Sequence, residues 1–340
     1  MKFLIVKLTI VMILCSIQPA QGLTIKLGTL APDGSTWYMQ LRDMGEKWKK
    51  ATDGKLNFKI YPGGVIGDEA DMVRKMRIGQ LHAAAVTYVG LSCIIPEINA
   101  FQMPLMFNSY EELDHVRKRL APELEALLES RGFIVLNWGD AGWVHIFSQK
   151  PVVYPRDLKI QNQHIFVWAG GTESFNAWKA AGFHPVEVAA PDIFMSLQTG
   201  LINTFATTQI VALSYQWFAL AKNMCDLAYA PLCGATIITK RKWDRIPKEI
   251  RPELMKIARS SGENLKKEIR NLDKTAVEIM KKHGLVVNPV PQDAVNEWKR
   301  MTEKYLYPEL LSKKVPPDMF KKVKELLGDY RKINRRMEKE

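Results

Sequence analysis

The sequence predicts an α/β protein folded into two lobes. Strand-like alternation and helical periodicity take turns along the chain, which is the pattern of α/β folds. The chain has 340 residues, and the roughly 318 that follow an N-terminal export signal exceed what one hydrophobic core usually holds. A helical pattern over 247–283 would extend about 55 Å, so this helix is expected to cross both lobes.

The first 22 residues have the layout of a cleavable signal peptide. Lys2 and Lys7 flank the start of an apolar run over 8–17, which is too short to span a bilayer. Cys15 is the only cysteine near a lipidation position, but its neighbours fit a lipobox poorly. The sequence therefore predicts a mature chain that begins near Leu23 and functions in the periplasm.

The first lobe is expected to begin with four strands and three helices. Ser35 is a suitable N-cap for the first helix, and Pro62-Gly63-Gly64 ends the second strand. The strand segments alternate apolar and polar residues or are β-compatible: 23–27, 56–60, 81–88 and 133–138. The helical segments repeat apolar residues at helical spacing: 36–52, 68–79 and 110–130.

A crossover is expected after Trp138, followed by the elements of the second lobe. Strands are predicted over 143–148, 165–168 and 235–239, and helices over 173–181, 191–199 and 247–283. The alternation favours a largely parallel sheet. No linker composition marks a boundary, so topology places it: lobe I is 23–141 with 233–270, lobe II is 142–232 with 271–330, and 331–340 is a basic C-terminal tail.

The formal net charge is +12, or +10 without Lys2 and Lys7. The positive residues lie between carboxylates on predicted helices and in the segment 321–339, so we expect a solvated face and a frayed basic terminus. No nucleic-acid-binding motif accompanies them, and nucleic acid is not a predicted partner. Electrostatic contact with a membrane surface or a protein partner is the alternative.

Three cysteines remain in the mature chain, and an odd number excludes a fully paired disulfide framework. A bridge between Cys225 and Cys233 is possible. Buried thiols are the favoured interpretation, because a chain of this size has a core that needs no such link.

The chain has none of the motifs of common catalytic or metal sites. Six histidines are scattered without metal-ligand spacing, and the pair Asp68-Glu69 is typical of the first turn of a helix. The glycines over 63–67 are better explained by a tight turn than by an anion cradle. The sequence predicts no enzyme, no metal site and no cofactor.

Aromatic and hydroxyl side chains gather instead at predicted strand ends and loops. Such residues suit a central cleft between two lobes, because indole and phenol rings bury apolar area and keep one polar group. The predicted ligand-binding residues are Trp37, Tyr38, Thr87, Tyr88, Trp143, His145, Phe166, Trp168, Phe205, Thr207, Thr208 and Trp217.

A series of short motifs follows in order along most of the chain. They are Tyr61-Pro62, Gly67-Asp68, Gly79-Gln80-Leu81, Pro96-Glu97, Phe101, Met103-Pro104, Phe107, Pro155–Lys159, Ser196–Asn203, and the segment from Gly234 to Ile246-Pro247. With these motifs, the chain from Leu23 to about Tyr307 resembles the solute-binding P subunits of the tripartite ATP-independent periplasmic (TRAP) transporters, the DctP-like family.

The resemblance implies a fold like the type II periplasmic binding proteins, with two α/β lobes, crossing strands and a long helix. It implies closure of the lobes on a small ligand, usually an organic acid. It also implies delivery of the ligand to TRAP membrane permease subunits, without any reaction. Some TRAP systems add a lipoprotein of TPR repeats, which makes such a lipoprotein a second possible partner.

The resemblance fails at the residues that usually hold a carboxylate. The position of the family's arginine falls on Phe166, and that of a following asparagine falls near Thr207. The favoured expectation is a largely apolar or weakly acidic ligand. One alternative is an ordinary organic acid held by Lys179, His145 or a bridging metal ion. Another is a sensory or scaffold protein with a TPR-type partner.

Overall fold

The computed structural model describes residues 22–169 and 171–337. Residues 1–21 of the predicted signal peptide lie outside this range, as do residues 338–340 of the predicted tail. Within it, none of the helices combines the length and the apolar character needed to traverse a bilayer.

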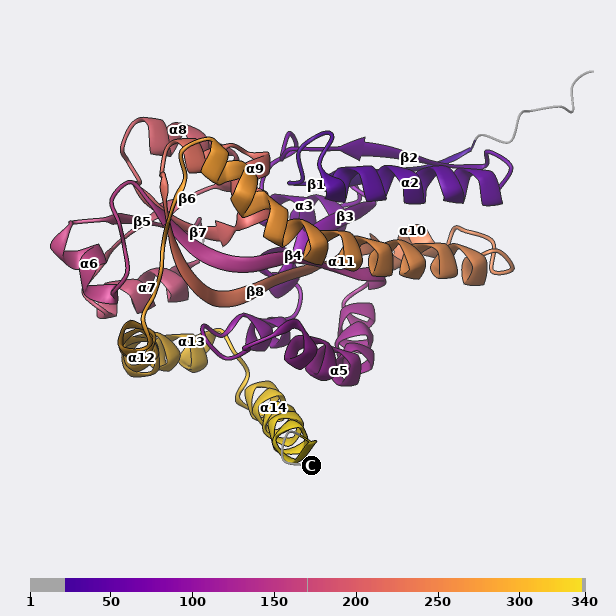
Figure 1. The fold of residues 1–340 in the computed structure, drawn as a ribbon. Coiled ribbons are helices and arrows are strands. Elements are labelled where there is room, and N and C mark those ends of the chain that lie inside the picture. The colour runs from indigo at the N-terminus through magenta and orange to yellow at the C-terminus, as the bar shows by residue number, and fades with distance from the viewer. Residues whose placement is uncertain (1–21, 170, 338–340) are drawn as a thin grey trace, which may run out of the picture.

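One nine-stranded mixed sheet forms the centre of the molecule (Figure 1). Its order is β2-β1-β3-β8-β4-β7-β5-β6, and β9 pairs with β8. Its strands are β1 (Leu23–Thr29), β2 (Leu56–Tyr61), β3 (Ala83–Thr87), β4 (Phe133–Ser148), β5 (His164–Trp168), β6 (His184–Val188), β7 (Thr204–Thr208), β8 (Asn223–Thr239) and β9 (Val286–Asn288). We call β2-β1-β3 the first half-sheet and β7-β5-β6 the second.

The prediction of a largely parallel sheet holds within each half-sheet and is wrong at the centre. Strands β1, β2 and β3 are parallel, as are β5, β6 and β7. Strands β4 and β8 are antiparallel to each other, and both run antiparallel to the neighbour that joins them to a half-sheet. The two central strands therefore link the half-sheets.

Strands β4 and β8 are far longer than the sequence predicts. The segments 133–138 and 143–148 belong to one 16-residue strand, and 235–239 is only the end of a 17-residue strand. The register shifts between Asp140 and Gly142, where Gly142 has a φ of 108°. Such a bulge breaks the alternation of apolar and polar residues without ending the strand. Pro231 also makes β8 hard to predict, because proline is rare in central strands and its presence argues against one.

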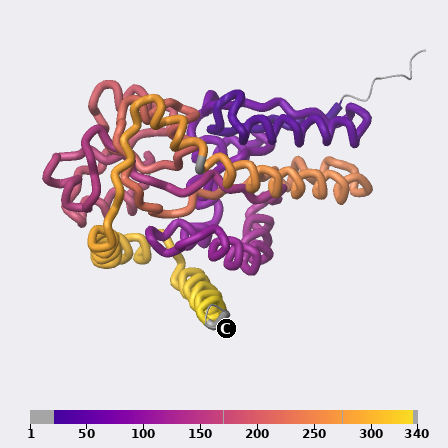
Figure 2. Tube along the Cα trace, in the orientation of Figure 1, coloured from indigo at the N-terminus to yellow at the C-terminus, as the bar shows by residue number. Residues whose placement is uncertain are grey.

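Helices cover both faces of the sheet (Figures 1 and 2). They are α2 (Thr36–Ala51), α3 (Glu69–Arg77), α4 (Tyr88–Ser92), α5 (Tyr110–Ser130), α6 (Pro155–Ile160), α7 (Thr172–Ala180), α8 (Ile193–Gln198), α9 (Gln209–Ser214), α10 (Lys240–Trp243), α11 (Arg251–Lys282), α12 (Gln292–Met301), α13 (Tyr307–Lys313) and α14 (Pro317–Met337). Shorter turns are η1 (Pro96–Gln102), η2 (Ala190–Asp192), η3 (Trp217–Ala219) and η4 (Thr302–Leu306).

The predicted long helix is confirmed as α11, with 32 residues and a length of about 48 Å. It packs on β4 and also on α2 beside the first half-sheet and α9 beside the second. The predicted lobe boundaries at 141, 232 and 270 fall inside β4, β8 and α11. The division itself stays a prediction.

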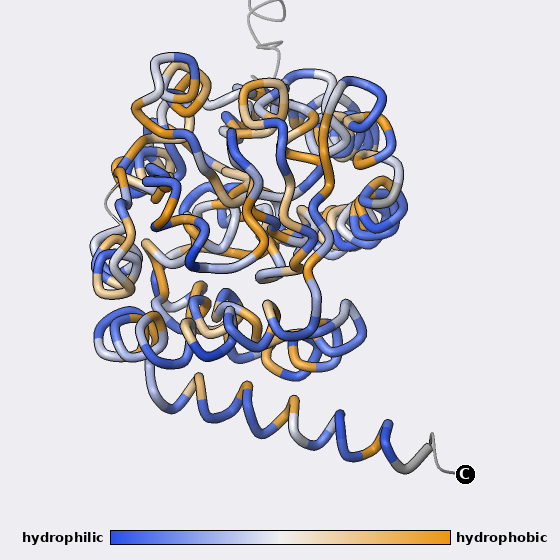
Figure 3. Tube along the Cα trace, turned by 60° about the vertical axis from the view of Figure 1, so that its left-hand side comes forward, coloured by the Kyte–Doolittle hydropathy of each residue, from blue (hydrophilic) through white to orange (hydrophobic). Residues whose placement is uncertain are grey.

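The predicted frayed basic terminus over 321–339 is wrong for its described part. Residues 317–337 form α14, which packs on α5 and η1. Met319, Val323 and Leu327 are buried at a spacing of four residues, and Lys322 pairs with Glu123 at 2.7 Å. The many charges of this segment lie around a narrow apolar stripe (Figure 3). Its composition is therefore that of a solvated tail, although the spacing of its apolar residues is helical.

Two of the three cysteines of the described chain agree with the favoured interpretation as buried thiols, and the third, Cys93, does not. Cys225 and Cys233 are buried and unbridged, and Cys93 is exposed. Burial raises the pKa of the Cys225 thiol to about 12. This thiol is therefore neutral and behaves as a small apolar side chain.

Candidate functional site

A cavity opens between the two half-sheets, and we call it the cleft cavity. Its walls come from the end of β1 and the loop after it, α2, α3 and β3 on one side. On the other side they come from β5, η2, α8, β7, α9 and η3. Its floor includes Ala141 of β4 and Leu232 of β8, the strands that join the halves. The space between the lining atoms, including the open solvent at the mouth, is about 920 Å³.

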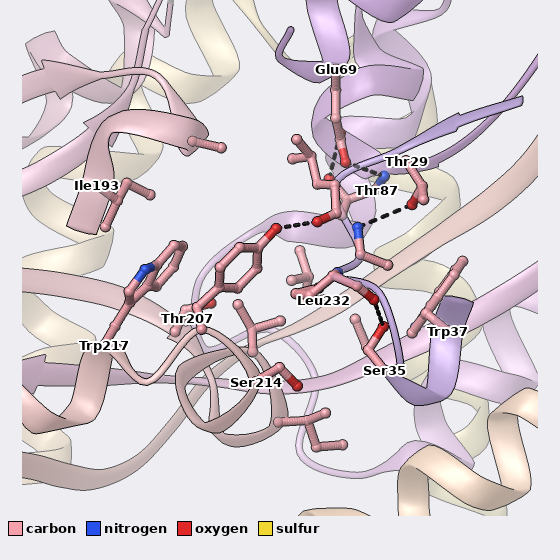
Figure 4. Close-up of a pocket in the computed structure, with 18 of the residues that line it drawn as sticks. Thr29, Ser35, Trp37, Glu69, Thr87, Ile193, Thr207, Ser214, Trp217 and Leu232 are labelled. Carbon is pink, nitrogen blue, oxygen red and sulfur yellow. Dashed lines mark hydrogen bonds between the residues drawn. The ribbon is translucent and has the colours of Figure 1, made fainter. Parts of the chain in front are cut away.

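Aromatic rings form much of the cavity wall. Trp217 stacks on Tyr215 with ring centroids 4.7 Å apart and meets the edge of Phe205 at 5.7 Å. Phe166 packs edge-to-face on Trp168 at 5.3 Å. Figure 4 shows Trp217 and Ile193 on one side of the cavity, and Thr29, Trp37, Glu69 and Thr87 on the other.

Most polar side chains of the cleft cavity are hydroxyls, and some of them are already bonded to nearby backbone. The Thr29 hydroxyl accepts a hydrogen bond from Ala31 N at 3.1 Å, and the Ser35 hydroxyl donates one to Pro32 O at 2.7 Å. Lysine, arginine and histidine are absent from the lining among the residues that the structure describes. The cavity therefore presents rings and aliphatic side chains rather than positive charge.

The one ionisable carboxyl group among the described lining residues is that of Glu69. Asp68 caps α3 and accepts from Glu69 N at 2.7 Å, as expected for first-turn charges. The Glu69 carboxylate turns inward and accepts hydrogen bonds from Thr87 N, Thr87 Oγ1 and Gly90 N at 2.7–2.8 Å. Burial nevertheless raises the pKa of Glu69 to about 7. Near neutral pH the Glu69 carboxyl group is therefore about half protonated.

The raised pKa of Glu69 predicts a pH-dependent stability. A carboxyl group that holds its proton more tightly when folded stabilises the protein at low pH, and this contribution is lost as the pH rises from about 4.5 to about 7. At about 1.4 kcal/mol for each pH unit, the loss is about 3 kcal/mol. We expect denaturant unfolding of wild type to show this loss relative to Glu69→Gln. A constant difference between the two proteins from pH 4.5 to 7.5 would show that the folded carboxyl group titrates normally.

Two hydrogen bonds join the rims of the cleft cavity. The Tyr215 hydroxyl, beside the second half-sheet, donates to Leu30 O, which follows β1. Ala190 N in η2 donates to the Asp68 carboxylate at 3.2 Å. Burial raises the pKa of Tyr215 far above neutral pH, so this hydroxyl keeps its donor proton. Both bonds hold the two sides of the cavity together.

The glycine turn after β2 brings these rims close. Gly64 has a φ of +74°, and a Cβ there would lie 3.1 Å from the Leu30 side chain and 3.3 Å from Pro191. Glycine is therefore needed for both the backbone conformation and the approach of the two sides. The predicted tight turn accounts for this segment.

Seven of the predicted ligand-binding residues line the cleft cavity. They are Trp37, Thr87, Phe166, Trp168, Phe205, Thr207 and Trp217. The other five lie elsewhere. Tyr38 is on α2 outside the lining, Tyr88 is buried in the core beside Phe101, Trp143 packs on Tyr110, and Thr208 caps α9. His145 is buried, with its Nδ1 3.1 Å from Trp143 O.

The alternative cations of the sequence prediction do not reach the cavity. Lys179 is exposed on α7 and lies over the ring of Phe175 at 5.9 Å. His145 Nε2 is 3.5 Å from Gln209 Nε2 and is absent from the lining. In residues 22–169 and 171–337, no group of three or more histidine, cysteine or carboxylate side chains is arranged to hold a metal ion.

Sequence reasoning missed two residues that define the cleft cavity. Glu69 looks like an ordinary helix-start charge, and only the approach of β3 to α3 shows that it is buried. Tyr215 lies outside every regular strand and helix, and its partner Leu30 is 185 residues away. No local pattern predicts a contact of that kind.

The described chain matches the family model for bacterial extracellular solute-binding proteins, family 7, over residues 27–313. A 2,3-diketo-L-gulonate-binding periplasmic protein of Escherichia coli is 24% identical over 277 residues, covering 78% of this chain and 80% of the relative.

Two solved structures of TRAP periplasmic solute-binding proteins share the fold. One from Sulfurospirillum deleyianum, with bound succinate, has a TM-score of 0.81 and 19% identity, and covers 89% of this chain and 98% of its own. One from Citrobacter koseri, with bound D-glucuronate, has a TM-score of 0.78 and 23% identity, and covers 88% of this chain and 98% of its own. The predicted α/β fold with a long helix is therefore confirmed.

Proposed function

The chain belongs to family 7 of the bacterial extracellular solute-binding proteins, the DctP family of TRAP transporters, and is a receptor rather than an enzyme. From this premise we propose that its cleft cavity captures a largely apolar, neutral or weakly acidic molecule. The observation that supports the proposal is the lining of the cavity, which offers aromatic rings and no positive side chain among the described residues.

The electrostatics of the cleft cavity favour this ligand class. A carboxylate that leaves water needs a charged partner or several donors to offset its desolvation. The hydroxyls of Thr29 and Ser35 are bonded to their own loop, and the buried Glu69 carboxyl would repel a second carboxylate when ionised. An apolar ligand instead gains about 25 cal/mol for each Å² that it buries against the rings.

The relatives with known ligands bind acids: succinate in one structure and D-glucuronate in another. In the resemblance described above, the family's arginine position falls on Phe166, which lines the cleft cavity here. A charge-assisted hydrogen bond contributes about 1.5–3 kcal/mol. Without it, we expect this receptor to bind such acids about ten- to a hundredfold more weakly.

The same family membership supports a periplasmic location and delivery of the ligand to a TRAP membrane permease. The curated relative from Escherichia coli is itself a periplasmic protein. Closure of the cavity, held by Tyr215 and Asp68, is the state that such a receptor would present to the permease. A TPR-repeat lipoprotein remains a further possible partner.

The test compares neutral and acidic ligands in refolded protein. The mature chain is unfolded, dialysed and refolded to remove cargo, then titrated with the neutral apolar probe N-phenyl-1-naphthylamine. We expect saturable probe fluorescence that succinate and D-glucuronate do not displace. Trp168→Ala should weaken the probe at least tenfold, because a buried aromatic side chain contributes about 1.5–3 kcal/mol.

Phe194→Ala, which removes an exposed ring on α8, is the matched control and should bind the probe like wild type. Displacement of the probe by either acid at micromolar concentration would refute an apolar cargo. It would leave the assignment as a solute receptor intact.

A further inference from the structure

The structure contains a second cavity, which we call the back cavity. Its walls come from η1 and the loop after it, from α7 and β8, and from α13 with the segment that leads into α14. It shares none of its lining residues with the cleft cavity. The space between its lining atoms, mouth included, is about 550 Å³.

The back cavity contains a lysine without an acidic partner. The Lys314 ammonium donates to Ser174 Oγ at 3.2 Å, and no carboxylate of the described residues lies within ion-pair distance of it. Burial lowers the pKa of Lys314 from its usual value. An ammonium group has three donors, so two remain for another partner.

Other polar atoms of the back cavity also lack partners among the described residues. They are Gln102 Nε2, Asn99 Oδ1 and the Tyr229 hydroxyl, which lies near the Thr302 side chain without a well-formed hydrogen bond to it. Asn99 Nδ2 donates to two carbonyl oxygens, Pro96 O and Lys314 O, which fixes the orientation of this amide. Asn99 is 4% exposed and Tyr229 is 7% exposed. Buried groups of this kind are normally hydrogen-bonded, so their presence in one lining indicates a polar occupant. Gln102 Nε2 and the Tyr229 hydroxyl can donate to an anion, whereas Asn99 Oδ1 can only accept.

The remaining walls are apolar. Trp178, which stacks on Tyr229 at 6.2 Å, faces the cavity together with Met103 and Leu310. Leu306 is the last residue of the π-helical turn η4, and such turns are frequent at functional sites. The cavity thus combines one cation and two further donors with a short apolar surface.

We propose that the back cavity is a second ligand site that binds a small monocarboxylate. The carboxylate accepts hydrogen bonds from the Lys314 ammonium, Gln102 Nε2 and the Tyr229 hydroxyl, and its alkyl group packs on Trp178. A charged partner offsets the desolvation of Lys314, which water alone does less well. Because η1 belongs to the side of the first half-sheet and α7 to that of the second, a bound molecule contacts both.

The experiment uses refolded mature protein with acetate and propionate as probes. Thermal unfolding is followed at constant ionic strength, with chloride replaced stepwise by the carboxylate. We expect a saturable rise of the unfolding temperature in wild type and in the control Lys313→Met, which alters an exposed lysine of α13. Lys314→Met should abolish the rise, and Tyr229→Phe should weaken the apparent affinity at least threefold.

The rise should persist when the cleft cavity is saturated with N-phenyl-1-naphthylamine, which separates this site from the proposed receptor function. No rise in wild type, or an equal rise in Lys314→Met, would overturn the proposal. A rise that the neutral probe removes would also overturn it, because the carboxylate would then occupy the cleft cavity.

Discussion

Phe166→Arg is expected to convert the cleft cavity into a site for organic acids at the cost of stability. Phe166 is 6% exposed and packs on Trp168, so an arginine there is buried. The one carboxyl group of the described lining, Glu69, already accepts three hydrogen bonds from Thr87 and Gly90 and is not placed to pair with it. An uncompensated buried charge lowers the free energy of unfolding by about 3–5 kcal/mol. Succinate or D-glucuronate should restore much of this loss, since a ligand at a hundred times its Kd adds about 2.7 kcal/mol.

The measurement is denaturant unfolding of wild type and Phe166→Arg, with and without 10 mM of each acid, a concentration chosen to be about a hundred times a Kd of order 100 μM. Phe166→Leu removes the ring without adding charge, and Phe194→Arg adds a guanidinium on exposed α8, outside the cavity. Neither control should gain stability from the acids beyond the wild-type response. If wild type gains as much as Phe166→Arg, the cavity already holds acids well, and the proposed apolar cargo is wrong.

The elements that sequence reasoning identified are those with one dominant period. Helix α5 spans Tyr110–Ser130 as predicted, and α11 differs from its prediction only at its ends. Both carry an apolar stripe at helical spacing, and this pattern can be recognised from the local sequence alone. The strand β1 was equally clear, because Ile25 and Leu27 alternate with polar residues.

Elements whose local pattern conflicts with their tertiary role were not predictable. The centre of β4 holds Asp140, Ala141 and Gly142, a sequence typical of a turn, yet the strand continues through it. Asp140 is fully buried there only because arginines from α5 and α11 meet it. Those arginines come from positions 117 and 270, and no spacing in the sequence reveals that they converge.

For the candidate site, the type of a residue indicated that it could line a cleft, but its place in the sequence did not show which face of the strand it occupies. The predicted rings Phe166, Trp168 and Trp217 line the cleft cavity, because large aromatic residues beside strand ends tend to face a cleft between sheets. Trp143 has the same character, but it lies across the β4 bulge and packs on Tyr110 instead. A bulge exchanges the faces of a strand, and sequence alternation cannot reveal it.

A buried ion network holds the centre of β4 to the helices on both sides. Asp140 is 0% exposed, and its carboxylate bonds Arg117 of α5 at 2.5 Å and Arg270 of α11 at 2.6 Å. Asp114 bonds both arginines at 2.7 Å, and Trp37 of the cleft cavity donates to Asp140 O at 3.0 Å. The network thus fixes the bulge that forms part of the cavity floor.

Asp140→Asn is expected to lower the free energy of unfolding by about 3–5 kcal/mol, because it leaves two guanidinium groups with one acidic partner. Arg117 is 4% exposed and cannot turn to water for compensation. Denaturant unfolding measures the effect. The matched control is Asp43→Asn, which breaks an exposed ion pair with Lys47 on α2 and should cost less than about 1 kcal/mol.

The double variant Asp140→Asn with Arg117→Met separates the ion pair from the general cost of altering a buried residue. Removing both charges leaves Arg270 paired with Asp114, so the double variant should be more stable than Asp140→Asn alone. A coupling energy of about 1–3 kcal/mol is expected from the cycle. If Asp140→Asn costs no more than Asp43→Asn, Asp114 alone satisfies both arginines and the bulge does not depend on Asp140. If the two substitutions are additive, the network does not act as a unit, and the floor of the cleft cavity is held by packing instead.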